Sequence, residues 1–390
     1  MNNIKKLQFF LLFLLFLLFT REGYSQPAAC YKFSDDLRMD MENDTTYYRM
    51  QMGATNYSIS GYFRKAMEIY GPRPLSQKSL ARFSPGDWKS VDARKYILKR
   101  SKKEQIIVIN EAHTNSRHRN FTASLLKKLY KNGYRYLGLE ALWNDKIVNQ
   151  RKFVVRDEGF YTREPEFGNL IFEAIKLGFT VFGYEAIGDK SGEAREQEQA
   201  QNIMDFMASH PEGKLLIHCG HDHVCENELS YWGGRAMAGR LKKGLGTELF
   251  TVSQTSYQEG RLPFNSGRRK RKNVPVILRH KKDGQVFNGL GNSQTDLCIV
   301  YPKTNYVHGR PVWQTYRRKP CTIKTDTLKY NPVLMTAYRK GEYDQDGTPA
   351  DIFEVSDSKR NTILFLSPGE YEIIFQNDRY EIIAQYSVSM

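Results

Sequence analysis

A glutamate and a histidine two residues apart, Glu111 and His113, follow an uninterrupted run of β-branched apolar residues at 106–109. Such a run predicts a buried strand that delivers both side chains at its tip. A carboxylate beside an imidazole can orient a general base, or the two can bind a divalent metal ion. Both arrangements activate water, so the pair indicates hydrolysis or a related attack by water.

Three further predicted strands also end in ionisable residues. Strand 134–139 ends at Glu140, strand 179–184 ends at Glu185, and strand 214–218 leads to His221, Asp222 and His223. Helical patterns at about 117–131, 167–177 and 193–208 separate these strands, and this alternation predicts parallel βαβ units. In open parallel sheets, ligands bind at the carboxyl ends of the strands, so we expect these side chains to share one crevice.

The sequence therefore predicts an α/β fold with a mostly parallel central sheet, helices on both faces and a small β-rich C-terminal part. We expect an irregular or helical lead-in at 26–100, the core domain at 101–260, a basic, loop-rich segment at 261–330 and a β-rich module at 331–390. In the core we also expect a helix near 231–242 and a strand at 248–252. In the module, 362–366, 371–375 and 380–387 predict a hairpin-like meander.

Several other kinds of site lack sequence support. There is no Gly-x-Ser-x-Gly motif and no Gly-rich phosphate loop. Cys219 is the cysteine nearest the predicted site, but no local signature marks it as a nucleophile. Glutamate and histidine suit Mn, Zn, Fe or Co, whereas the absence of a CxxC motif argues against a structural zinc.

The strand-end residues also carry a family resemblance. Residues 109–115 (INEAHTN), the stretch ending at Glu140, the helix led by Arg195 and the turn 220–224 (GHDHV) resemble the erythromycin-esterase-like, ChaN-like and TraB/TIKI-like superfamily. Its pattern is Gly-Glu-x-His followed by a strand ending in Glu; Asn110 stands here in place of the Gly. The resemblance covers about residues 104–254 and implies a mixed α/β core whose polar set is Glu111, His113, Glu140 and His223. Members include hydrolases of lactone esters, metal-dependent membrane-tethered proteases and haem-binding proteins of iron uptake.

These observations lead to the prediction of a hydrolase that acts on an ester or amide of a small-molecule or peptide substrate. His113 would activate water, while Glu111 and Glu140 would orient it or, with His113 and His223, bind a divalent metal (Mn, Zn, Co or Fe). Arg195 and Glu185 would bind substrate. Two alternatives remain open: a haem- or iron-binding protein using His113, His221 or His223, and a non-catalytic cell-surface interaction protein.

The N-terminal residues predict export. Lys5 and Lys6 precede an apolar run at 7–19, as in a secretory signal peptide cut after Ser25; the alternative is an uncleaved membrane anchor, although the run is shorter than the roughly 20 residues a span needs. We expect the protein in a periplasm or outside the cell, where disulfides form, with Cys298–Cys321 as the preferred pair among five cysteines.

The formal net charge is +15, which favours anionic partners. The densest basic run, Arg268, Arg269, Lys270, Arg271 and Lys272, is typical of a solvated loop, and contact of this loop with an anionic surface is the alternative. No recognition motif accompanies the charge, so we expect no nucleic-acid partner.

Overall fold

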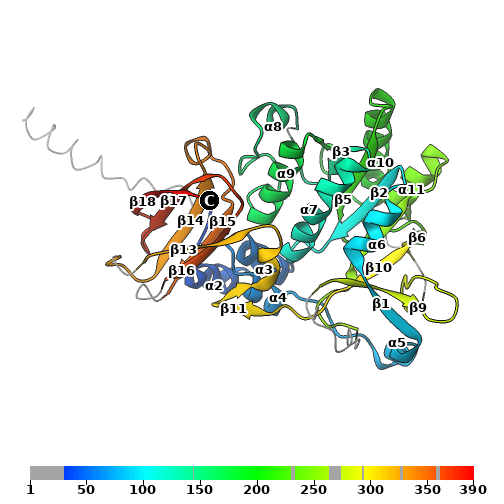
Figure 1. Ribbon diagram of the computed structural model, residues 1–390, viewed down its shortest axis with the longest axis horizontal. Coiled ribbons are helices and arrows are strands. Elements are labelled where there is room, and N and C mark those ends of the chain that lie inside the picture. The colour runs from blue at the N-terminus through cyan, green and yellow to red at the C-terminus, as the bar shows by residue number, and fades with distance from the viewer. Residues whose placement is uncertain are drawn as a thin grey trace, which may run out of the picture. The chain divides into compact units, whose positions relative to one another are not determined.

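An eight-stranded sheet, in the order β1-β9-β10-β8-β2-β5-β3-β4, forms the centre of the fold (Figure 1). The computed structural model describes residues 30–143, 145–229, 233–262, 274–291, 294–325, 328–356 and 361–390. The six strands from β10 to β4 are parallel, whereas β9 is antiparallel to both β1 and β10. This confirms the predicted α/β fold with its mostly parallel sheet. The strands are β1 Trp88–Asp92, β2 Ile106–Glu111, β3 Tyr134–Leu139, β4 Thr180–Gly183, β5 Lys214–Gly220, β8 Phe250–Tyr257, β9 Val276–His280 and β10 Leu297–Val300.

Helices cover both faces of this sheet because the central strands are apolar on both sides. In β2, Ile107 and Ile109 belong to one buried cluster with residues of α6 to α9, whereas Ile106 and Val108 belong to another with residues of α10 and α11. Alternate residues of a strand face opposite sides, which gives two cores from one apolar run. The helices are α6 Ala93–Arg100, α7 Ser116–Lys131, α8 Asp145–Arg151, α9 Pro165–Leu177, α10 Gly192–Ser209 and α11 Met237–Leu245.

The register of the central strands brings their carboxyl ends together. Glu111 at the end of β2 pairs with Gly220 of β5, and Leu139 at the end of β3 pairs with both His218 of β5 and Gly183 of β4. The residues that follow these strands therefore meet at one edge of the sheet, as predicted.

Two core elements differ from their predicted positions. The helix expected near 231–242 begins at Met237, because Gly233 and Gly234 have φ values of 68° and 139° that a helix cannot include. The segment predicted to be loop-rich, 261–330, supplies β9 and β10 to the central sheet. These strands are five and four residues long, too short to stand out among polar neighbours.

The C-terminal part forms two smaller sheets. One has the order β15-β14-β17-β18, and the other pairs β13 with β16. The predicted hairpin between β17 and β18 is present, but the expected pairing of 362–366 with 371–375 is wrong, since the turn at 367–369 carries the chain from one sheet to the other. The strands are β13 Lys319–Ile323, β14 Val333–Arg339, β15 Asp351–Val355, β16 Thr362–Leu366, β17 Glu370–Gln376 and β18 Ile382–Ser389.

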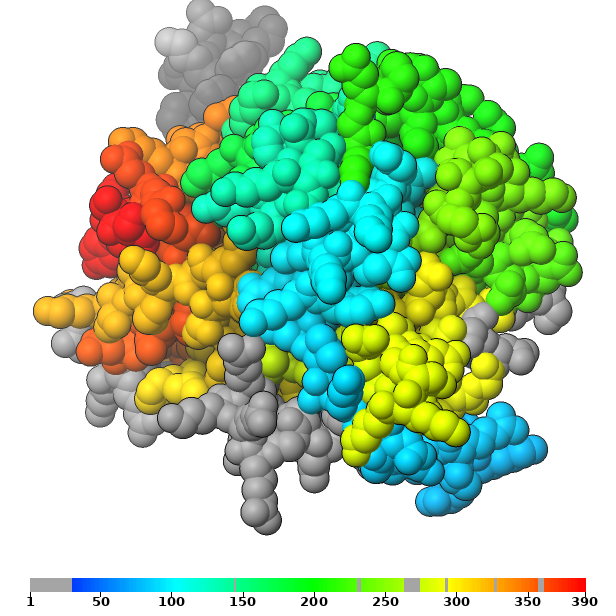
Figure 2. Space-filling model, turned by 45° about the vertical axis from the view of Figure 1, so that its right-hand side comes forward, coloured from blue at the N-terminus to red at the C-terminus, as the bar shows by residue number. Residues whose placement is uncertain are grey.

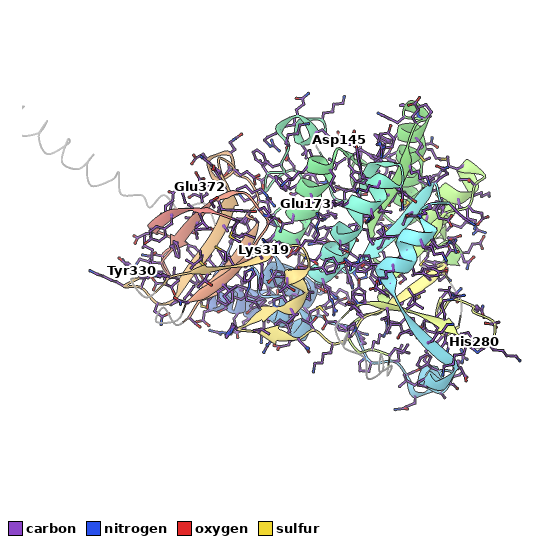
Figure 3. All side chains as sticks on the ribbon, in the orientation of Figure 1. Asp145, Glu173, His280, Lys319, Tyr330 and Glu372 are labelled. Atoms are coloured by element: carbon purple, nitrogen blue, oxygen red, sulfur yellow. The ribbon has the colours of Figure 1, made fainter. Side chains whose placement is uncertain are left out.

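Helix α9 packs between the central sheet and the C-terminal sheets. It lies between them in Figure 1, and Figure 3 marks Glu173 on it. Arg317 pairs with Glu173 at 2.6 Å, and Arg318 pairs with the buried Glu166. These ion pairs fix the C-terminal sheets against the helix layer that also carries part of the candidate site.

The remaining predictions have different outcomes. Cys298 lies in β10 and Cys321 in β13, in different sheets, and neither forms a disulfide, so the predicted pair is wrong. The predicted signal peptide and the run Arg268–Lys272 lie outside the described residues. None of the helices that the structure describes is long and apolar enough to cross a membrane. The N-terminal lead-in contains the helices α2 Ser34–Asn43, α3 Arg49–Ile59, α4 Phe63–Ile69 and α5 Gln77–Leu80. Elsewhere in the chain, four strands of two residues each form two small pairs: β6 Glu228–Leu229 with β7 Gly234–Arg235, and β11 Tyr306–Val307 with β12 Arg310–Pro311.

Candidate active site

Glu111 is the centre of a buried ionic network at the end of β2. Its two carboxylate oxygens accept hydrogen bonds from Arg119 at 2.6 and 2.5 Å, from His218 Nε2 at 2.8 Å and from His113 Nδ1 at 3.0 Å. Burial raises the pKa of Glu111, but the Arg119 charge and the two histidine hydrogen bonds outweigh it, so the pKa lies well below its ordinary value. Glu111 is therefore a carboxylate that only accepts hydrogen bonds.

Arg119 is fixed by a second carboxylate. It lies on α7, which begins directly after the loop that follows β2, and donates to Glu164 Oε2 at 2.8 Å. Glu164 in turn accepts the backbone N–H of Phe167 and so caps the N-terminus of α9. Both side chains of this ion pair are buried. Helices α7 and α9 thus hold Glu111 in place from outside the sheet.

His113 has a defined tautomer in this network. Since Glu111 can only accept, Nδ1 of His113 carries the proton, and in the neutral ring Nε2 has a free lone pair. The ring stacks on Tyr161, with centroids 4.3 Å apart, and His221 meets it edge-on at 5.1 Å. The side chain is 13% exposed, against 3% for Glu111, so His113 is the member of the pair that can reach a substrate.

A second network surrounds Glu140, which follows β3. Its Oε1 accepts from Arg195 at 2.8 Å and lies 3.3 Å from His223 Nε2. Arg195 also makes two hydrogen bonds to Glu185, at 2.9 and 2.5 Å. His223 Nδ1 lies 2.9 Å from the buried Glu196. Two cations and three carboxylates thus alternate along the ends of β3, β4 and β5.

The charges of this network set its protonation. Burial lowers the pKa of His223, but Glu140 and Glu196 outweigh it, so the pKa is raised. Burial lowers the pKa of His221 to about 4, assisted by the charge of His113. His221 is consequently neutral near pH 7, whereas the environment of His223 favours its charged form.

The two networks meet above Gly220, the last residue of β5. A Cβ atom placed on Gly220 would lie 2.7 Å from His113 Nε2 and 3.2 Å from Glu140 Oε2. The Gly220 N–H donates to the same Glu140 oxygen. Glycine therefore permits the free nitrogen of His113 and the carboxylate of Glu140 to converge on one point.

We expect Gly220→Ala to reduce activity by about a hundredfold while the protein stays folded. The φ of Gly220 is −79°, which alanine adopts freely, so the backbone is not strained. The added Cβ would instead lie 2.5 Å from His113 Cε1 and 3.2 Å from Glu140 Oε2, and would push these two side chains apart. Circular dichroism and turnover of the same preparation check this. Gly86→Ala is the control because a Cβ there meets nothing within 4 Å; equal activity of both variants would contradict the convergence.

Acid is expected to remove the stabilisation that Glu140 provides. Burial raises its pKa, but the charges of His223, His113 and Arg195 and the Gly220 N–H outweigh it and bring it from 4.5 to about 2. A lowered pKa stabilises the fold above the ordinary pKa, and that contribution, about 3 kcal/mol, is lost as the pH falls from about 4.5 to 2. Urea unfolding of wild type and Glu140→Gln should show a stability difference at pH 5.5 that shrinks by pH 2.5. A difference independent of pH would contradict it.

The structure brings all six predicted site residues together: Glu111, His113, Glu140, Glu185, Arg195 and His223. Sequence reasoning missed the role of Arg119, Tyr161, Glu196 and His218. His218 pairs in register with Ile109, which places its side chain on the same face of the sheet as Glu111. The sequence does not show this register, and Tyr161 lies in a polar insertion with no periodic signal.

The donor set does not fit the predicted divalent metal. Among the residues that the structure describes, no group of three or more His, Cys, Asp or Glu side chains could hold a metal ion. Glu111 is paired with Arg119 and Glu140 with Arg195, so a cation would have to displace a guanidinium at either carboxylate. Both nitrogens of His223 also have carboxylate partners, Nδ1 with Glu196 and Nε2 with Glu140. Nε2 of His113 is then the atom among the four predicted ligands that could still bind a metal ion.

No protein-family model and no curated protein matches the sequence. The type III effector HopBA1 aligns with 56% of this chain and 96% of its own, at 9% identity and a TM-score of 0.35. RRSP, a MARTX toxin effector domain from Vibrio vulnificus CMCP6, aligns over 53% of this chain and 43% of its own, at 16% identity and a TM-score of 0.30.

The C-terminal region of Pasteurella multocida toxin, described as having a thiol-protease like catalytic triad, is a third similar structure. It aligns over 87% of this chain and 51% of its own, at 9% identity and a TM-score of 0.30. Similarity at these TM-scores carries no conclusion about fold or function. The superfamily resemblance therefore stays a prediction from the residues that carry it.

Proposed function

We propose that the protein is a hydrolase of esters or amides in which His113 activates water without a metal ion. The observation that carries this is the Glu111–His113 pair, with Nδ1 bonded to a buried carboxylate and Nε2 free at the end of a parallel sheet. A base held this way is oriented by its carboxylate, which also stabilises the imidazolium that forms.

The reaction would begin with water between His113 and the carbonyl carbon of the substrate. His113 Nε2 takes one proton of the water as its oxygen bonds to that carbon. The π electron pair of the carbonyl group moves to the carbonyl oxygen. When this electron pair re-forms the carbonyl bond, the bond to the leaving alcohol or amine breaks. His113 then gives its proton to the leaving group, so the enzyme ends in its starting form.

Arg195 and His223 would stabilise the negative charge that develops on the substrate. The Arg195 side chain is 27% exposed although it bonds to Glu140 and Glu185, so part of the guanidinium is accessible. Fixed positive groups at a site of developing charge stabilise the transition state because they need little reorganisation. Glu140 and Glu185 position Arg195, while Glu196 positions His223.

The test is a screen of fluorogenic carboxylic esters, lactones and peptides with wild type and His113→Ala, each with and without EDTA. The proposal expects turnover of at least one substrate class by wild type, unchanged by EDTA and lost in the variant. Activity that EDTA abolishes would disprove the metal-free mechanism. The absence of turnover across all classes, or equal turnover by the variant, would disprove the proposed hydrolase.

A further inference from the structure

A cavity of about 470 Å³ lies beside α7, apart from the candidate active site. Helix α7 lines it with Arg117, Asn120, Phe121 and Ser124, whose spacing puts them on one face of the helix. Arg119, which holds Glu111, projects from a different face. A volume of this size falls within the range of small-molecule pockets in proteins.

Aromatic side chains form much of the cavity wall. Phe121 comes from α7, and Trp313 and Tyr316 come from a short 3-10 helix, Val312–Tyr316, that follows β12. In Figure 2 the cyan residues of α6 lie beside the gold segment that contains this short helix. The Arg94 guanidinium, at the start of α6, lies 4.0 Å from the centre of the Tyr316 ring. The wall therefore offers apolar surface with a cation fixed at its edge.

The charges that line the cavity are mostly positive. The lining contains three cations, Arg94, Arg117 and Lys303, and one carboxylate, Asp92, which caps α6 by accepting the N–H of Lys95. Arg117 is paired with Glu259 at 3.4 Å. Within the ranges that the structure describes, neither Arg94 nor Lys303 forms an ion pair with a carboxylate. Two cations at the cavity thus remain available to an anionic ligand.

We propose that this cavity binds a small apolar anion, namely an aromatic or aliphatic carboxylate or sulfonate. Its hydrocarbon part contacts Phe121, Trp313 and Tyr316, and its charged end lies between Arg94 and Lys303. Burial of apolar surface supplies most of the affinity, and the two cations supply the preference for an anion. This site is independent of the proposed hydrolysis, since none of its residues belongs to the candidate active site.

The test uses two fluorescent probes with one ring skeleton, anilinonaphthalene sulfonate and the neutral phenylnaphthylamine. The purified protein is expected to bind one sulfonate molecule saturably and several-fold more tightly than the neutral probe. Arg94→Gln and Lys303→Gln are each expected to weaken sulfonate binding by about two- to fivefold and to leave the neutral probe unaffected. Lys303 is exposed, so this variant is expected to fold normally.

Lys319→Gln is the matched control. Lys319 is an exposed lysine on β13, outside the cavity lining and marked in Figure 3. The proposal expects this variant to bind both probes as wild type does. Equal affinity for the two probes, unsaturable binding, or the same weakening in Lys319→Gln as in Lys303→Gln would overturn the proposal.

Discussion

Replacing His113 with alanine is expected to reduce hydrolysis by about a thousandfold, the size of effect that general bases provide. The variant keeps Glu111, Arg119 and His218, which remain bonded to one another, so the fold is expected to survive. What it loses is the free Nε2 beside Glu140 above Gly220. The measurement is kcat/KM on the best substrate of the screen.

His280→Ala is the matched control for this variant. His280 is also bonded to a carboxylate, Asp283 at 3.0 Å, but it lies in β9, far from the strand ends that carry the site (Figure 3). Its activity should equal that of wild type. If His113→Ala also kept wild-type activity, His113 would not be the base.

Replacing Arg119 with methionine is expected to destabilise the fold by about 3–5 kcal/mol, the usual result of removing one partner from a buried ion pair. Arg119 is 1% exposed and neutralises two carboxylates, Glu111 and Glu164, that are equally buried. Methionine fills a similar volume but leaves both charges without a cation. Urea unfolding at pH 7 measures the loss.

The control removes an arginine from an exposed pair. Arg38 and Glu42 bond at 3.0 Å on α2, with 51% and 58% of their side chains exposed. Arg38→Met should therefore leave the unfolding midpoint close to that of wild type. The double variant Arg119→Met/Glu164→Gln should recover part of the lost stability because one uncompensated charge is removed. An Arg119→Met midpoint equal to wild type would contradict the importance of the network.

Much of the fold followed from the sequence because its core strands are strongly patterned. The runs that became β2 and β3 are apolar and lead to Glu111 and Glu140. Helical spacing marked α7 between these two strands and α9 between β3 and β4. Strands β9 and β10 were not predicted because they are short and lie among basic, polar residues. Their place beside β1 and β8 is set by long-range packing that local pattern does not encode.

The sequence predicted the site residues that follow the strands, but it did not predict the buried residues that hold them in place. Glu111, His113, Glu140 and His223 each follow a recognisable strand, and parallel strands gather such residues at one edge. Arg119 and Glu196 lie within helices whose periodicity gives no reason to separate them from solvent-exposed charges. Only the docking of α7 and α10 on the sheet reveals that both are buried.

The central claim is that Glu111 holds His113 with its proton on Nδ1 and leaves Nε2 free as the base. Nitrogen-15 NMR of the protein labelled at histidine, with His113 assigned by comparison with His113→Ala, reads the tautomer directly and needs no substrate. In spectra recorded at a pH where the ring is neutral, the predicted result is a protonated Nδ1 and an unprotonated Nε2. A neutral ring protonated at Nε2 would contradict the account.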